Sequence, residues 1–218
     1  MTVIQKISDH IAPFMKEQGF CYKQKCFYKI HNDIAFCVQL DATVGLIHAT
    51  YFVIPLYIPC SSRYYSYGKR ITDSSASRLA ALPREASDDE IAKWCAQLCS
   101  YLETTVFPLF HRISTPKQMV KLVEWKLLLR QDLFSCPPVL VLRLLMFSHL
   151  YLGERGVLQK TIKKYEKALK NSSFFTNEVR SYFLEEMDLI KRIVQQGDDS
   201  IRNYCSATIA DAVSKCFT

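Results

Sequence analysis

The chain has 218 residues, of which 49% are hydrophobic and 22% are charged, and its formal net charge is +7. This length is sufficient to bury a sizeable core, and the composition is close to the globular average, which excludes disorder as the default state. The most apolar stretch, Val139–Leu152, contains 11 apolar residues in 14. A membrane-spanning helix needs roughly 20 such residues. We therefore predict a buried core helix in this stretch and no membrane association.

The first 85 residues have the pattern of a small α+β domain. Residues 2–19 have helical hydrophobic spacing that charged side chains interrupt, unlike the apolar core of a secretory signal peptide, so we expect a cytoplasmic protein. Hydrophobic and polar residues then alternate over 20–30 and over 34–40, whereas residues 46–54 are apolar on both faces. These segments predict three antiparallel strands packed on the N-terminal helix. The side chains expected on the buried face of the second strand are Ile34, Phe36, Val38 and Leu40.

The remaining residues repeat at helical spacing. Ser87 and Glu90 form a capping box before the first helix, and Thr115 and Thr176 precede two others. Consecutive helices joined by short turns pack as antiparallel neighbours. The expected fold class is therefore α+β: an N-terminal helix packed on a small antiparallel sheet in a domain at 1–85, followed by a helical bundle or short helical stack at 86–218.

Residues 12–41 also carry a recognisable pattern. Its segments are Ala12-Pro13-Phe14-Met15-Lys16, Gly19-Phe20, Lys23, Phe27-Tyr28 and Val38-Gln39-Leu40. The pattern resembles the opening of a bacterial family of uncharacterised domains with a helix, a Gly-Phe turn and aromatic strands, over roughly residues 1–110. The resemblance implies an α+β N-terminal domain without assigned catalytic residues. It also suggests the setting of small bacterial accessory proteins, among which toxin-neutralising immunity proteins are frequent.

The nine cysteines include no Cys-x-x-Cys pair, and we expect them to be reduced and mostly buried. Cys95 and Cys99 have the spacing of two metal ligands on a helix, but their sequence neighbours are apolar and no histidine is near. We therefore predict neither a metal nor a cofactor. A nucleophile formed by Cys60 with His48 or His111 is the enzymatic alternative.

Arg143 is the one charged residue of the apolar helix. A buried guanidinium without a counter-ion would cost several kcal/mol. We predict that Asp132 or Glu124, which precede it in the sequence, supplies the counter-ion.

The segment between Cys60 and Ser77 is rich in tyrosine, serine and basic residues and is predicted to be an exposed loop. Tyrosine and arginine are enriched at protein interfaces, and loops on rigid scaffolds often carry binding residues. The alternative is that the tyrosines pack back on the sheet. The candidate partner-binding residues are Arg63, Tyr64, Tyr65, Tyr67, Lys69 and Arg70.

Positive charge is concentrated between residues 117 and 170, which contain 11 basic and 4 acidic residues. Five lysines recur there at helical spacing and predict a basic face for phosphates or for an acidic protein; the alternative is an ordinary solvated helix face. Acidic residues of a later helix are predicted to pair with this face. The lysines are Lys160, Lys163, Lys164, Lys167 and Lys170, and the acidic residues are Glu185, Glu186 and Asp188.

These patterns favour a non-enzymatic, cytoplasmic protein-binding module. In its most specific form it is a bacterial immunity-type protein that neutralises a toxin partner with an acidic surface. The first alternative is a nucleic-acid-binding protein that uses the basic helix face. The second is a hydrolase with an unrecognised site.

Overall fold

The computed structural model describes residues 2–60, 67–74, 77, 79–129 and 134–217, and the chain divides into two compact units. The sheet unit comprises Met1–Ile54 and Tyr65–Ser114, and the helical unit comprises Pro55–Tyr64 and Thr115–Thr218. The domain boundary expected after residue 85 falls within the sheet unit. The helix that begins at Asp88 belongs to this unit because it packs against the N-terminal helix.

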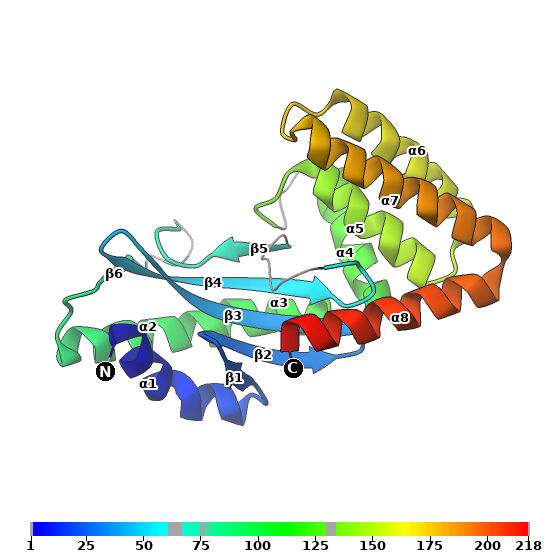
Figure 1. Ribbon diagram of the computed structural model, residues 1–218. Coiled ribbons are helices and arrows are strands. Elements are labelled where there is room, and N and C mark those ends of the chain that lie inside the picture. Colours follow the sequence, from blue (N-terminus) through cyan, green and yellow to red (C-terminus); the bar gives the residue numbers. More distant parts are fainter. Residues whose placement is uncertain (1, 61–66, 75–76, 78, 130–133, 218) are drawn as a thin grey trace. The chain divides into compact units, whose positions relative to one another are not determined.

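The sheet unit combines an antiparallel sheet with helices (Figure 1). The helices are α1 (Val3–Glu17), α2 (Asp88–Tyr101) and α3 (Phe107–Arg112), with a π-helical turn at Leu102–Val106 between the last two. The strands are β1 (Cys21–Lys23), β2 (Cys26–His31), β3 (Ile34–Thr43), β4 (Leu46–Pro55), β5 (Tyr67–Arg70) and β6 (Leu82–Pro83). The strand order is β1-β2-β3-β4-β5, and β6 pairs with β4.

The first predicted strand is divided into two. Gln24 and Lys25 adopt left-handed backbone conformations, with φ of 49° and 64°, and form the turn between β1 and β2. The strands pair so that Tyr22 faces Phe27 across the hairpin, with ring centroids 4.7 Å apart. The continuous alternation predicted over 20–30 is therefore wrong: the turn resets the period, Phe27 is buried, and Ile30 is 40% exposed.

The burial predicted for the second strand is confirmed. Ile34, Phe36, Val38 and Leu40 are all buried in β3. Ala35 and Cys37, which point to the opposite face, are buried as well. β4 lies inside the sheet and is buried along nearly its whole length, as its apolar sequence predicts.

The helical unit confirms the predicted succession of packed helices. Its elements are α4 (Pro116–Leu128), α5 (Pro138–Tyr151), α6 (Arg155–Asn171), α7 (Asn177–Gln196) and α8 (Asp198–Phe217). Thr115 and Thr176 cap α4 and α7 by accepting backbone hydrogen bonds. Each helix packs against the next, and α5 also packs against α8. The predicted apolar helix is α5, which has more buried residues than any other helix of the unit. No helix within the described ranges is long and apolar enough to span a bilayer.

Candidate functional site

Three of the six candidate partner-binding residues lie within the described part of the chain. Arg63, Tyr64 and Tyr65 lie outside the described residues. Tyr67, Lys69 and Arg70 belong to β5, which pairs with β4 in the sheet.

Tyr67 is 4% exposed, so the expectation that it projects from a loop as a contact residue is wrong. The reason is the close approach of β5 to β4: a Cβ at Gly68 would overlap the Tyr51 carbonyl oxygen and the Phe52 side chain. The glycine therefore allows the strand to pair and brings Tyr67 into the interior. Arg70, at the end of β5, is exposed and Lys69 is half-buried.

The predicted lysine face exists on α6. Its five lysines are exposed, whereas Leu158, Ile162, Tyr165 and Leu169 are buried on the same helix. A shallow depression of about 370 Å³ is lined by lysines of this face together with Glu166 and Asn171. The lysines are Lys160, Lys163, Lys164, Lys167 and Lys170, of which Lys163, Lys167 and Lys170 line the depression.

The acidic residues of α7 do not neutralise this face. Asp188 pairs with Lys191 of its own helix at 3.0 Å, and Lys191 in turn lies 3.6 Å from Glu166 of α6. Lys170 also pairs with Glu166, at 3.0 Å. The predicted pairing of the acidic α7 residues with the lysine face is therefore wrong, and most of the face keeps its positive charge.

Glu186 points into the helical unit instead and binds Arg143. The Arg143 Nε and Nη2 atoms donate to the Glu186 carboxylate at 2.7 and 2.5 Å, and Nη2 also donates to the Pro59 carbonyl oxygen at 3.1 Å. Glu186, which the sequence did not predict, is therefore a counter-ion of Arg143. Glu124 lies near His149, 3.6 Å from Nε2. Asp132 lies outside the described residues.

Exposed aromatic side chains gather where α6 passes into α7. Phe174 is 65% exposed and Tyr182 is 56% exposed. Phe175 contacts Phe174 and Phe183, with ring centroids 5.1 and 5.2 Å apart, and Phe183 lies 5.3 Å from the Arg143 guanidinium. The exposed rings thus rest on half-buried rings that a buried ion pair holds in place. Val179, three positions before Tyr182 on α7, is 40% exposed. We call Phe174, Tyr182 and the adjoining Val179 the aromatic patch.

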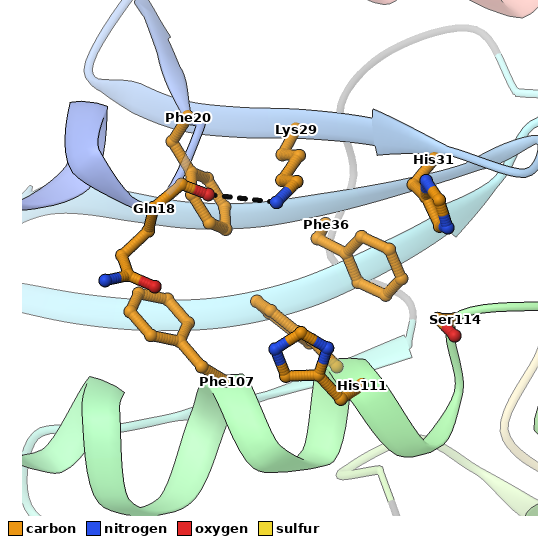
Figure 2. A pocket seen from close by; sticks show the side chains of 9 residues that line it. Gln18, Phe20, Lys29, His31, Phe36, Phe107, His111 and Ser114 are labelled. Atoms are coloured by element: carbon orange, nitrogen blue, oxygen red, sulfur yellow. Dashed lines mark hydrogen bonds between the residues drawn. The ribbon is translucent and has the colours of Figure 1, made fainter.

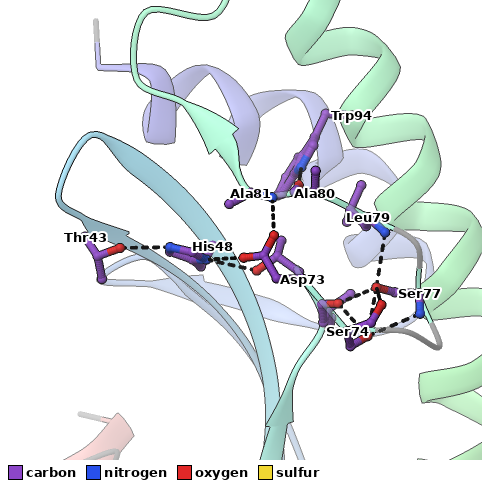
Figure 3. Close-up of polar contacts among 11 residues, drawn as sticks. Thr43, His48, Asp73, Ser74, Ser77, Leu79, Ala80, Ala81 and Trp94 are labelled. Atoms are coloured by element: carbon purple, nitrogen blue, oxygen red, sulfur yellow. Dashed lines mark hydrogen bonds and ion pairs between the residues drawn. The ribbon is translucent and has the colours of Figure 1, made fainter.

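His48 is the centre of a polar network in the sheet unit (Figure 3). Its Nε2 atom lies 2.8 Å from Thr43 Oγ1, and its Nδ1 atom lies 3.1 Å from Thr72 Oγ1 and 3.4 Å from Asp73 Oδ2. His48 is buried, whereas Thr43 is exposed at the end of β3. A hydroxyl on one ring nitrogen and a carboxylate near the other are also found in a Ser-His-Asp triad, but the hydrogen-bond partner of Nδ1 here is the Thr72 hydroxyl rather than the carboxylate.

The segment after β5 holds Asp73 in this network. Asp73 has a left-handed backbone with φ of 59°, and its Oδ1 atom accepts a hydrogen bond from the Ala81 amide at 3.0 Å. Trp94 of α2 fixes the same segment by donating from Nε1 to the Ala80 carbonyl oxygen at 2.9 Å. The sequence does not indicate that Asp73 faces His48. Thr72, the residue before Asp73, is already 24 positions from His48 along the chain.

A second arrangement in the sheet unit is a pocket of about 180 Å³ (Figure 2). Its walls are phenylalanine rings from the turn after α1, from β3 and from α3. Its rim consists of polar residues, among them side chains of β2 and α3 that contain nitrogen. The wall residues are Phe20, Phe36, Phe107 and Phe110, and the rim residues are Gln18, Lys29, His31, His111 and Ser114.

The cysteines are free thiols, as expected. Cys60 Sγ lies 3.6 Å from Cys216 Sγ, and burial together with this second thiol raises the pKa of Cys60 to about 12. A thiol that stays protonated at neutral pH is a poor nucleophile. Burial likewise raises the pKa of Cys95 to about 12 and that of Cys99 to about 11. Within the described part of the chain, no group of three metal-ligating side chains occurs.

Comparisons of the chain with family models, with curated proteins and with solved structures give no match.

Proposed function

We propose that the protein is a non-enzymatic protein-binding module whose helical unit contacts an acidic partner. The observation that carries the proposal is the exposure of Phe174 and Tyr182 just after the lysine-rich end of α6. Large aromatic side chains are enriched among the residues that dominate binding energies at protein interfaces. An exposed aromatic patch on a supported scaffold is therefore more readily explained by a partner than by stability.

The charge around the aromatic patch indicates the chemistry of the partner. Lys163, Lys167 and Lys170 line the depression at the end of α6, and Phe174 follows Lys170 by four residues. Acidic side chains on the partner would be attracted to these lysines and would speed association. An immunity-type protein that neutralises a toxin is a specific case of this proposal, and its support is the resemblance at residues 12–41.

The proposal is tested by capture from the native host with immobilised protein. We expect an acidic protein to be retained by the parent and by Val157→Ala, a control at the opposite end of α6. The double variant Phe174→Ala/Tyr182→Ala should lose it. Calorimetry with that purified partner should then show a loss of at least about 2 kcal/mol for the double variant. Equal retention by all three proteins would contradict the proposal.

The lysine face also supports the nucleic-acid alternative, and salt dependence separates the two. Binding to duplex DNA releases counterions, with a log–log slope of about −0.9 per phosphate neutralised. We expect only weak, non-specific binding to duplex or single strands. Tight, salt-sensitive binding that is abolished by changing Lys160, Lys163 and Lys167 to Glu would favour the alternative.

The His48 network favours hydrolysis as a second candidate function. In the tautomer with the proton on Nδ1, His48 would accept the Thr43 hydroxyl proton at Nε2 while Oγ1 attacks an ester carbonyl. The same proton would pass to the leaving alcohol, and water would then release the acid from the acyl-threonine. Thr72, with Asp73 beside it, would orient the imidazole from the Nδ1 side.

4-Nitrophenyl acetate tests this second function directly. The binding proposal predicts no turnover above that in buffer. Turnover that Thr43→Val and His48→Gln abolish, but that the exposed control Thr105→Val retains, would make the protein a hydrolase.

A further inference from the structure

The pocket of the sheet unit has an aromatic interior. Phe20 and Phe107 stack with ring centroids 5.5 Å apart, and Phe36 and Phe110 approach to 4.8 Å. Each of these four residues keeps between 4% and 8% of its surface exposed although it belongs to the core. The rings therefore form a wall that is packed from behind and open towards the pocket, which suits a flat apolar ligand.

The rim of the pocket is rich in hydrogen-bond donors. His31 extends from the end of β2 and His111 from α3, on either side of Phe36 in the view of Figure 2. Neither imidazole has a hydrogen-bond or ion-pair partner among the described residues, and each carries at least one N–H in either tautomer. Of the described residues that line the pocket, none has a carboxylate.

Lys29 places a positive charge at the same rim. Its Nζ atom donates to the Gln18 carbonyl oxygen at 3.0 Å, at the end of α1. Its side chain also passes beside Gly19, where an added Cβ would lie 3.4 Å from Nζ and 3.5 Å from Cε. The hydrogen bond to Gln18 holds the ammonium group in position, and two of its three N–H donors stay available. A fixed cation loses less conformational freedom when it binds an anion.

We propose that this pocket binds a single-ring aromatic acid, with the ring against the phenylalanines and the anionic group at Lys29, His31 and His111. The volume sets the ligand size: an apolar cavity of about 150 Å³ accommodates benzene, and the pocket has about 180 Å³. It therefore holds one ring with a small substituent. This site lies in the sheet unit and does not depend on the proposed partner of the helical unit.

The test is a titration followed by NMR of the histidine ring signals and the backbone amides. Benzoate and phenyl phosphate are the probes, benzamide is the neutral control, and acetate is the control without a ring. At least one aromatic acid should saturate with a Kd below about 1 mM. Benzamide should bind at least about tenfold more weakly, because it cannot form the charge-assisted contacts. The tighter of the two acids identifies the anionic group.

Matched variants locate the binding. Lys29→Met/His111→Gln should weaken the aromatic acid at least about tenfold. The control Lys93→Met/His10→Gln changes the same residue types at exposed positions of α2 and α1 and should bind like the parent. Ser114→Leu, which narrows the pocket from its rim, should also weaken binding while thermal melts show a folded protein. Absence of saturation by either acid, equal affinity for benzamide, or equal loss in the control would overturn the proposal.

Discussion

At the scale of the residue, the Arg143–Glu186 pair is the most consequential contact of the helical unit. Both side chains are buried, and the guanidinium also lies 5.1 Å from the Phe147 ring and 5.3 Å from the Phe183 ring. A charge in this position is tolerated only while the opposite charge and the remaining acceptors are present. The pair thus links the core of the helical unit to the rings beneath the aromatic patch.

We predict that Glu186→Gln destabilises the protein by about 3–5 kcal/mol, because the Arg143 charge stays buried without its counter-ion. Urea unfolding monitored by circular dichroism measures the change. The matched control is Glu185→Gln at the exposed neighbouring position, which should stay within about 0.5 kcal/mol of the parent. A Glu186→Gln variant as stable as the control would show that water or another group compensates the charge.

At the scale of the element, the neighbouring strands β2 and β3 differ strongly in burial. β3 is buried on both faces, whereas β2 changes from buried at Cys26 to exposed at His31. The difference follows from position in the sheet, because α3 places the Phe110 ring against Phe36 of β3. A mutation is therefore costly or harmless according to what packs on that strand.

Replacement of Phe36 by Ala should cost about 3–5 kcal/mol, since it removes a buried ring and leaves a cavity beside Phe110. Thermal and chemical denaturation provide the measurement. Ile30→Ala, at a position of β2 that is 40% exposed, is the control and should change stability much less. Similar effects of the two substitutions would be inconsistent with the burial of β3.

At the scale of the whole molecule, buried thiol and phenol groups make the stability of the fold vary with pH in the alkaline range. Burial raises the pKa of Cys95 from 9.0 to about 12 and that of Cys205 from 9.0 to about 11. It also raises the pKa of Tyr51 and of Tyr204 from 10.0 to about 12. In each case the unfolded chain loses the proton first, so this contribution to stability is fully present below the unfolded pKa and is lost as the pH rises towards the folded pKa.

We therefore predict that the melting temperature is nearly constant from about pH 7 to 8.5 and falls between about pH 9 and 11. Scanning calorimetry in buffers of matched ionic strength measures this profile. Cys205→Ala should make the decline less steep, whereas Cys21→Ala, at an exposed position, should leave its slope unchanged. A melting temperature that is constant up to pH 11 would contradict the burial of these groups.

The local sequence pattern was sufficient to predict most helices and strands, but not the turn between β1 and β2 or the pairing of β5 with β4. The capping box at Ser87 and Glu90 forms as predicted, because both partners lie within one helical turn. The β1–β2 turn escaped prediction, because Gln24 and Lys25 are not typical left-handed residues. Gly68 is the residue that signals the close approach of β5, but a lone glycine in a tyrosine-rich segment equally indicates a loop.

The candidate sites depend on contacts that sequence spacing cannot encode. His31 and His111 line one pocket although 80 positions separate them, and Arg143 finds its partner 43 positions away. The sequence shows the aromatic content and the lysine spacing. The packing of the helices determines that Phe174 is exposed and that the acidic residues of α7 do not neutralise the lysine face.

The sequence by itself determined the α+β class, the succession of helices and the burial of β3, β4 and α5, because hydrophobic period and caps act within a few residues. Only the tertiary structure decided that Tyr67 is buried, that Glu186 neutralises Arg143 and that Asp73 faces His48. The physical reason is that a buried polar group takes whichever partner the packed elements bring within hydrogen-bond distance, and that choice is made across the chain rather than along it.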